Sequence, residues 1–557
     1  MPNLNRRTFL TTAAAGTAAA SLTPRTAFAK NYTNAPSVKP NTVATKDTAV
    51  VETECGKVRG FTQSGTYLFR NIPYGATTAG PNRFLPAKKP EAWTGVKPTM
   101  AYGPVCPQVA RAGWHNNEEA WLMDWDDGFP GEDCLSLNIW TPAINDNKKR
   151  TVMFWIHGGG YSAGSSRELP SYDGMRLTQR GDVVVVSVNH RLNLLGFLNL
   201  APYGDQFKQS ANVGMTDIVL ALEWVKTNIS NFGGDPNSVM IFGQSGGGGK
   251  VSFLMGMPSA QGLYHRAIIE SGSQPRNYTL DDSAKVSAAL LKELNVTNAT
   301  DLQTISYDKL LTAATNALRT LNPPPRQGGL RQSGGATYGW NPVIDGQVIP
   351  ETPFYPKAPD ISAKIPILIG STLNEFVSAT DHPEFLDLTE AELLKRVEVA
   401  LPGKAEEAIA IYRRADPHAI PFEIWSRMNA TTAMRRNAVE QAKRKAEQGT
   451  GAYLYQFRWR TPVLDGRPGA FHCSEIAFAF DNTDRCNTST GGGEDARTLA
   501  ANVSDCWLQF AKTGNPNHKG MPQWDSVTKD KVPTLLIDNK CELKNDFDKD
   551  ELRITNS

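Results

Sequence analysis

Several short runs along the chain are almost entirely apolar. The runs lie at residues 152–156, 183–188, 239–242, 365–369, 453–457 and 534–537. A continuous apolar run of this length is typical of a strand buried on both faces, because a half-exposed strand would alternate apolar and polar side chains. The pattern therefore predicts a large, mainly parallel central sheet that begins near residue 151.

Amphipathic segments alternate with these runs. Between Met215 and Ile229 the apolar residues recur at helical spacing, and a second helical pattern covers residues 495–512 before a glycine and a proline. Strands that alternate with helices predict an α/β fold in which helices flank the sheet. The first third of the chain is rich in glycine, proline and aromatic residues, so it predicts antiparallel edge strands and long loops.

The N-terminus has the features of an export signal. Arg6 and Arg7 precede a mildly apolar Ala/Thr-rich stretch and an Ala-Phe-Ala site at residues 27–29, as in twin-arginine signal peptides. A disordered basic tail is the alternative. No run of 18 apolar residues follows, so no membrane anchor is expected. We expect a periplasmic or secreted protein divided into a signal peptide (1–29), a polar linker (30–48), one folded catalytic domain (49–545) and a tail (546–557).

Charge and cysteine content exclude some partners. The 58 basic and 56 acidic residues give a net charge of +2, with no basic stripe or acidic tail, so neither nucleic acid nor an anionic membrane is an expected partner. The cysteines form neither a C-x-x-C pair nor a Cys/His cluster at zinc spacing. Their odd number leaves at least one unpaired within the chain: Cys55, Cys106, Cys134, Cys473, Cys486, Cys506 and Cys541.

Candidate chemistry begins where one buried strand ends. The run at 239–242 leads into Gly243-Gln244-Ser245-Gly246-Gly247, a G-x-S-x-G sequence. A strand that enters a tight turn and then a helix exposes a serine hydroxyl, and the glycines leave room for the strained turn. Ser245 is the candidate nucleophile, and such a serine needs a base and donors for the oxyanion that it creates.

A base for this serine should be a histidine that follows it, with the acid between the two in the chain. Five histidines follow the serine: His265, His382, His418, His472 and His518. His472 lies in a loop after the late strand at 453–457. His265 lies in an expected helix close to the serine, and His518 lies in a polar loop. His382 and His418 fall in the cap, which we expect the helix-rich segments 280–335 and 380–450 to form over the catalytic end. On position alone, a structural role for His472 is the alternative.

The acid should follow a strand between the candidate serine and histidine. Glu375 follows the strand at 365–369 and is the candidate. Asp345 competes with it but lies in an Asp-Gly pair typical of a turn, and Asp381 and Glu384 lie further into the cap.

Oxyanion donors are supplied by a second glycine-rich segment. The sequence His157-Gly158-Gly159-Gly160, here called the glycine loop, follows the strand at 152–156, and consecutive glycines let backbone N–H groups approach a substrate. Gly246 would give a further N–H. Lys250 follows Gly249 but is followed by Val251, which excludes a phosphate-binding P-loop.

With these residues assembled, the chain resembles the type B carboxylesterases, the esterase/lipase family that includes the cholinesterases, from about residue 50 to 540. The shared motifs lie at residues 132–140, 157–160, 189–192, 243–247, 270–272 and 510–516. The resemblance implies an α/β-hydrolase fold with helical cap insertions. It also implies a Ser245–Glu375–His472 triad, an oxyanion hole from Gly159, Gly160 and Gly246, and a Cys106–Cys134 disulfide.

The chain departs from the family at three positions beside these residues. Gln244 stands where the family usually has Glu, Gly246 where it usually has Ala, and Phe376 where Gly commonly follows the acid. Loss of a carboxylate beside Ser245 removes an attraction for cationic substrates, so a choline ester is disfavoured.

These features predict a serine hydrolase that cleaves small-molecule carboxylic esters through an acyl-enzyme, with no metal or cofactor. Amide or thioester hydrolysis, or acyl transfer, on the same residues is the alternative, and a non-catalytic cholinesterase-like binding module is a more distant one. The acyl and alcohol preferences and the oligomeric state do not follow from the sequence.

Overall fold

The computed structural model describes residues 41–110, 117–273, 278–322, 338–380 and 382–555. Within Thr42–Ser557, which form one compact unit, the described residues build a central sheet of twelve strands. In spatial order these are β1 (Thr42–Val43), β4 (Phe61–Gln63), β5 (Thr66–Pro73), β7 (Ser136–Thr141), β9 (Val184–Val188), β8 (Arg150–Ile156), β10 (Gly234–Gln244), β11 (Arg266–Glu270), β12 (Ile367–Thr372), β13 (Ala452–Phe457), β14 (Pro533–Ile537) and β15 (Glu542–Asn545).

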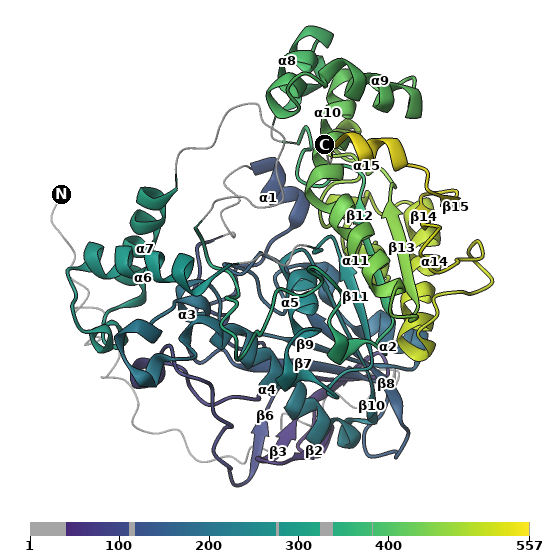
Figure 1. Ribbon diagram of the computed structural model, residues 1–557. Coiled ribbons are helices and arrows are strands. Elements are labelled where there is room, and N and C mark those ends of the chain that lie inside the picture. The colour runs from purple at the N-terminus through teal and green to yellow at the C-terminus, as the bar shows by residue number, and fades with distance from the viewer. Residues whose placement is uncertain (1–40, 111–116, 274–277, 323–337, 381, 556–557) are drawn as a thin grey trace, which may run out of the picture. The chain divides into compact units, whose positions relative to one another are not determined.

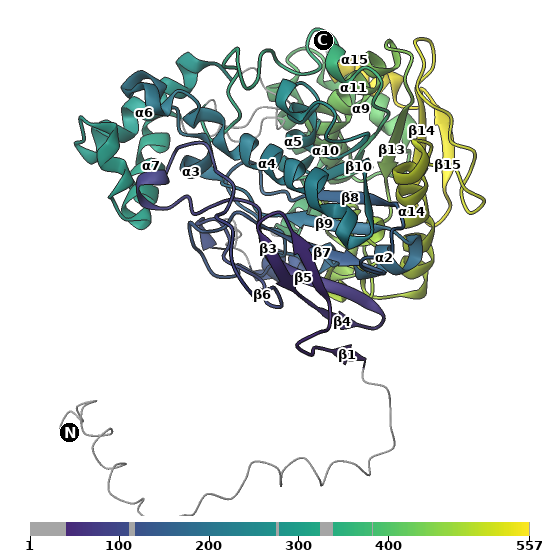
Figure 2. The same cartoon turned by 90° about the horizontal axis from the view of Figure 1, so that it is seen from below.

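The centre of this sheet is parallel, as the apolar runs predict. Strands β9, β8 and β10 to β14 pair in parallel, and every residue of β9 and β13 is buried. Antiparallel strands lie at both edges, with β1, β4, β5 and β7 on one side and β15 on the other. Figure 2 shows the N-terminal edge beside a smaller sheet of β2 (Val50–Thr53), β3 (Gly56–Arg59) and β6 (Val96–Pro98).

Helices cover both faces of the sheet. Because side chains alternate along a strand, Val152, Phe154 and Ile156 of β8 join one hydrophobic cluster while Met153 and Trp155 join another. Helices α4 (Val213–Asn228), α5 (Gly246–Leu254) and α11 (Arg436–Ala446) contribute to the first cluster, and α2 (Met175–Gly181) and α14 (Glu494–Thr513) to the second. This is the predicted α/β-hydrolase architecture.

Two groups of helices are inserted between the later strands. One is the pair α6 (Leu280–Leu294) and α7 (Tyr307–Leu321), and the other comprises α8 (Glu390–Ala400), α9 (Ala405–Ala415) and α10 (Pro421–Ala430). Figure 1 shows these groups apart from each other. They occupy the segments predicted to be helix-rich.

The C-terminal stretch expected to be a tail contains a helix, α15 (Lys549–Thr555). Its Glu551 is paired with Arg427 of α10 at 2.7 Å, and Asp548 is paired with the buried Arg435 at 2.7 Å. The first ion pair holds the C-terminal helix against α10, and the second holds the residue before that helix against the helical turn that follows α10. No helix of the described ranges is both long and apolar enough to span a membrane.

Candidate active site

Ser245 lies on a strained turn between β10 and α5. Its backbone has φ 56° and ψ −124°, a conformation rare for a residue with a side chain. Its N–H donates to the Glu270 carbonyl oxygen at 2.8 Å, which ties the turn to β11. A Cβ on Gly246 would lie 2.1 Å from the Gly160 carbonyl oxygen, and one on Gly247 would lie 2.0 Å from that of Ile156. The glycines are therefore required by close backbone contact as well as by the turn.

His472 and Glu375 meet although 97 residues separate them. His472 Nδ1 donates to Glu375 Oε2 at 2.5 Å, and their side chains are 7% and 1% exposed. The other carboxylate oxygen, Oε1, accepts from the Thr372 backbone N–H at 2.9 Å, and the Glu375 N–H donates to the Thr372 hydroxyl at 3.1 Å. The Phe376 ring lies against the His472 ring with centroids 3.9 Å apart. Neither ring nor carboxylate is free to turn away.

Gln244 connects His472 to the serine turn. Its Nε2 lies 3.4 Å from His472 Nε2, and its Oε1 accepts from the Cys473 thiol at 3.2 Å. The bond with the thiol fixes which end of the amide faces the imidazole. In this resting geometry the Ser245 hydroxyl makes no hydrogen bond with any described residue, and catalytic hydrogen bonds in substrate-free enzymes often tighten only on binding.

The glycine loop lies directly against Ser245. A Cβ on Gly158 would lie 3.5 Å from the Cβ of Ser245. Gly159 and Gly160 are exposed, with φ of 76° and 61°. The Gly159 carbonyl oxygen accepts from the Ala163 N–H at 3.0 Å. Because C=O and N–H point in opposite directions across a trans peptide, this bond turns the Gly160 N–H away from residue 163.

Two further buried carboxyls lie near the site: Glu475 interacts with Glu375, and Glu270 interacts with Glu475. Trp507 Nε1 donates to Glu270 Oε1 at 2.6 Å, and the Ser271 hydroxyl donates to Glu475 Oε1 at 3.2 Å. The second oxygen of each carboxyl has no hydrogen-bond partner among the described residues. Burial raises the pKa of Glu270 to about 7, and burial followed by the charges of Glu270 and Glu375 raises the pKa of Glu475 well above its usual value. The raised pKa values mean that both carboxyls carry less negative charge near neutral pH than exposed carboxyls would.

The structure differs from two expectations outside the candidate catalytic residues: it shows no Cys106–Cys134 disulfide, and His265 does not lie in a helix. Cys106 and Cys134, predicted to form a disulfide, are both buried thiols here, although their side chains are hydrogen-bonded to each other, the largest cause of the raised pKa of Cys134. His265, expected in a helix, lies in a bend directly before β11, where its Nδ1 accepts from the Val239 N–H at 3.2 Å. The chain must return to β10 as the neighbouring strand, which leaves no length for a helix.

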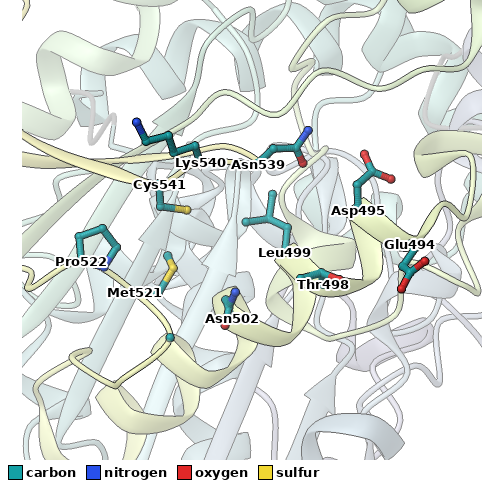
Figure 3. Close-up of a pocket in the computed structure, with 11 residues that line it drawn as sticks. Glu494, Asp495, Thr498, Leu499, Asn502, Met521, Pro522, Asn539, Lys540 and Cys541 are labelled. Atoms are coloured by element: carbon teal, nitrogen blue, oxygen red, sulfur yellow. The ribbon is translucent and has the colours of Figure 1, made fainter.

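A separate hollow lies away from these residues. It encloses about 630 Å³ and is formed by α14 residues Glu494 to Asn502 together with the segments 520–522 and 539–541 (Figure 3). None of the predicted site residues lines it, so it is not part of the candidate active site.

The fold and the site together define an α/β hydrolase. Comparison with known proteins identifies its family: residues 47–555 match the Carboxylesterase family, and the chain belongs to it. It is 32% identical over 504 residues to the para-nitrobenzyl esterase of Bacillus subtilis (strain 168), covering 89% of this chain and 96% of the relative. It is also 32% identical over 517 residues to the phenmedipham hydrolase of Pseudarthrobacter oxydans, covering 89% and 97%.

Solved structures agree with this assignment. An esterase from Clostridium hathewayi, described as able to hydrolyse aliphatic aromatic polyesters, superposes with a TM-score of 0.79 at 37% identity, covering 92% of this chain and 98% of that one. A carboxylesterase of Geobacillus stearothermophilus superposes with a TM-score of 0.75 at 32% identity, covering 91% and 99%. The chain is thus a carboxylic ester hydrolase that acts on small-molecule esters.

Sequence reasoning did not find the residues that support the site. Thr372 is signalled only by its place three residues before Glu375, and the contact between Gln244 and His472 has no signal beyond the departure from the usual Glu. The position of Lys250 beneath the glycine loop has no sequence signal, since the loop lies 93 residues earlier.

Proposed function

We propose that Ser245, His472 and Glu375 form the catalytic triad of this esterase and that the N–H groups of Gly159, Gly160 and Gly246 form its oxyanion hole. One observation carries the proposal. A buried imidazole is held by a carboxylate through Nδ1, so its Nε2 is left unprotonated on the side of the serine turn. A histidine in this tautomer is a general base for a hydroxyl beside it.

The geometry supports the following sequence of steps. Ser245 Oγ attacks the ester carbonyl carbon while His472 Nε2 takes the hydroxyl proton, and the Glu375 carboxylate stabilises the imidazolium. The carbonyl electron pair becomes an oxyanion that accepts from the glycine N–H groups. His472 gives its proton to the departing alkoxide, which leaves as the alcohol, and water then hydrolyses the acyl-enzyme by the same steps.

Ser245→Ala tests this assignment. We expect the variant to fold with an unchanged Tm and to lose at least about 10³-fold in kcat for a p-nitrophenyl ester, because the nucleophile itself is removed. The wild type should cleave the ester at least about 10²-fold faster than the matching p-nitroanilide. Ester cleavage by Ser245→Ala near the wild-type rate would refute the triad, and an anilide rate equal to the ester rate would favour amide chemistry.

We also propose that residues 1–29 are a twin-arginine signal peptide, so that the mature chain is periplasmic or secreted. The paired Arg6 and Arg7 and the Ala-Phe-Ala site support this. Outside the cytoplasm a thiol–disulfide oxidant would take two electrons and two protons from Cys106 and Cys134 and join them as a disulfide. Replacing Arg6 and Arg7 with lysine should leave the unprocessed precursor in the cytoplasm, and normal export of that variant would contradict the proposal.

A further inference from the structure

The first turn of α5 touches the neighbouring backbone without side chains. Positions 246 to 249 are all glycine, and a Cβ on any of the first three would lie within about 3 Å of a backbone atom. Helix α5 therefore lies against β8 and the glycine loop at backbone distance. Lys250 carries the first side chain after Ser245, and it occupies the space behind the loop.

Lys250 makes a specific contact in that space. The residue is fully buried, and its Nζ donates to the His157 carbonyl oxygen at 3.1 Å. The same Nζ lies 5.6 Å from the centre of the Tyr161 ring. Burial lowers the pKa of Lys250 to about 7, and the charge of Glu168 opposes this shift. Burying an amine costs free energy unless it is hydrogen-bonded, and the bond to the His157 carbonyl oxygen offsets part of that cost.

The contact fixes the peptide at the start of the glycine loop. Its carbonyl, on His157, accepts from Lys250, and its N–H, on Gly158, is hydrogen-bonded to the Tyr172 hydroxyl. The next peptide is held by the His157 ring, whose Nδ1 donates to the Gly158 carbonyl oxygen at 3.0 Å. Since that carbonyl points inward, the Gly159 N–H points in the opposite direction. The direction of the oxyanion donors thus depends on contacts behind the loop.

The other titratable groups here support a neutral ring at His157. The rings of His157 and His190 stack with centroids 4.8 Å apart, and burial followed by the charge of Lys250 lowers the pKa of both well below the usual value. His190 Nδ1 donates to the Arg191 carbonyl oxygen at 2.9 Å. Each neutral ring therefore donates its single N–H to a backbone carbonyl oxygen.

We propose that Lys250 is a positioning residue of the oxyanion hole, holding the His157 carbonyl so that the N–H groups of Gly159 and Gly160 face the carbonyl oxygen of the substrate. The proposal rests on the proposed function of Ser245 and the glycine loop. Its consequence is that removal of the Lys250 donor weakens transition-state binding much more than substrate binding, because a loop peptide that can rotate misplaces donors needed only by the oxyanion.

Lys250→Met is the central variant, because methionine keeps an unbranched side chain of similar length and removes the donor. The matched control is Lys445→Met. Lys445 lies in α11, away from the glycine loop, and it is also fully buried. Its Nζ donates to the carbonyl oxygens of Ser362 and Ala363. Each variant is measured for Tm, kcat and KM with a p-nitrophenyl ester, and for inhibition by an aryl trifluoromethyl ketone. This ketone bonds to Ser245 Oγ, its carbonyl oxygen becomes an oxyanion, and the serine proton passes to His472.

Lys250→Met should lower kcat about 10- to 100-fold and change KM less than about 3-fold. It should weaken the affinity for the ketone by the same factor by which kcat/KM falls. Lys445→Met should lower Tm without changing the ratio of ketone affinity to KM. Lys250→Gln, which keeps one donor, should recover part of the ketone affinity.

Unchanged kcat and ketone affinity in folded Lys250→Met would overturn the proposal, as would failure of both Lys250 variants to fold, since the residue would then be structural. The two proposals can fail separately. An active Ser245→Ala variant would refute the triad assignment, whereas an inactive Ser245→Ala together with a fully active Lys250→Met would refute only the role of Lys250.

Discussion

The bond between His472 and Glu375 allows a sharp test through Glu375→Gln. In the wild type, Oε2 accepts from His472 Nδ1 at 2.5 Å and Oε1 accepts from the Thr372 N–H at 2.9 Å. Glutamine can keep the second bond only by directing its NH₂ group at Nδ1. The proton then moves to Nε2, and the imidazole can no longer accept the serine proton.

The structure sets the size of the effect. Reversing the amide would restore the tautomer but would place the NH₂ group against the Thr372 N–H, leaving buried donors unsatisfied at a cost of about 1–3 kcal/mol. Loss of the charge-assisted bond to the imidazolium costs about 1.5–3 kcal/mol more. Together these give about 2.5–6 kcal/mol in activation free energy, or about 10²- to 10⁴-fold in kcat.

The assay is kcat with a p-nitrophenyl ester, accompanied by Tm. The control is Glu384→Gln, which makes the same change in an exposed pair where His382 Nδ1 lies 3.0 Å from Glu384 Oε1, and it should leave kcat unchanged. A folded Glu375→Gln enzyme within about 5-fold of the wild-type kcat would refute this account of the tautomer.

Three further predictions follow from the buried groups around the site. The Glu270 carboxyl is protonated in the fold up to about pH 7 but in the unfolded chain only below its ordinary pKa of 4.5, so stability is lost as pH rises through this window. Glu270→Gln should therefore reduce the fall in unfolding free energy between pH 4.5 and 8 by about 3 kcal/mol. The unfolding free energy is measured by denaturant titration at each pH, and the same pH dependence in both proteins would contradict this. Gln244→Glu places a carboxylate near His472 Nε2, stabilises the imidazolium and should move the acid limb of the kcat/KM profile to higher pH; an unmoved limb would argue against the contact. In exported protein the Cys106–Cys134 disulfide should leave five titratable thiols in denaturant and add about 3–4 kcal/mol of stability, since it closes a loop of about 29 residues; seven thiols would exclude it.

The sheet could be predicted because burial on both faces leaves a local record. The runs that became β8, β9, β10 and β13 are apolar at nearly every position, and that pattern needs no knowledge of the neighbouring strands. The failed prediction at His265 shows the limit. His265 was expected in a helix close to the serine, but the pairing of β11 beside β10 requires the chain to return at once to the sheet.

The candidate site was predictable to the same extent. The positions of Ser245 and Glu375 follow from strand ends, which meet at one edge of a parallel sheet. The contacts of Gln244 and Lys250 depend on how segments 228 and 93 residues apart are brought together, and no residue pattern within either segment records that distance. The roles of the triad and of the oxyanion donors stay predictions until the enzyme is assayed.

Covalent labelling with a fluorophosphonate tests the central claim most directly, since such a reagent bonds only to a serine that an adjacent base has activated. The account predicts one phosphonyl group per chain, found by peptide mass spectrometry on Ser245, with ester hydrolysis lost in proportion to labelling. Label on another residue, or hydrolysis that continues after Ser245 is fully labelled, would contradict it.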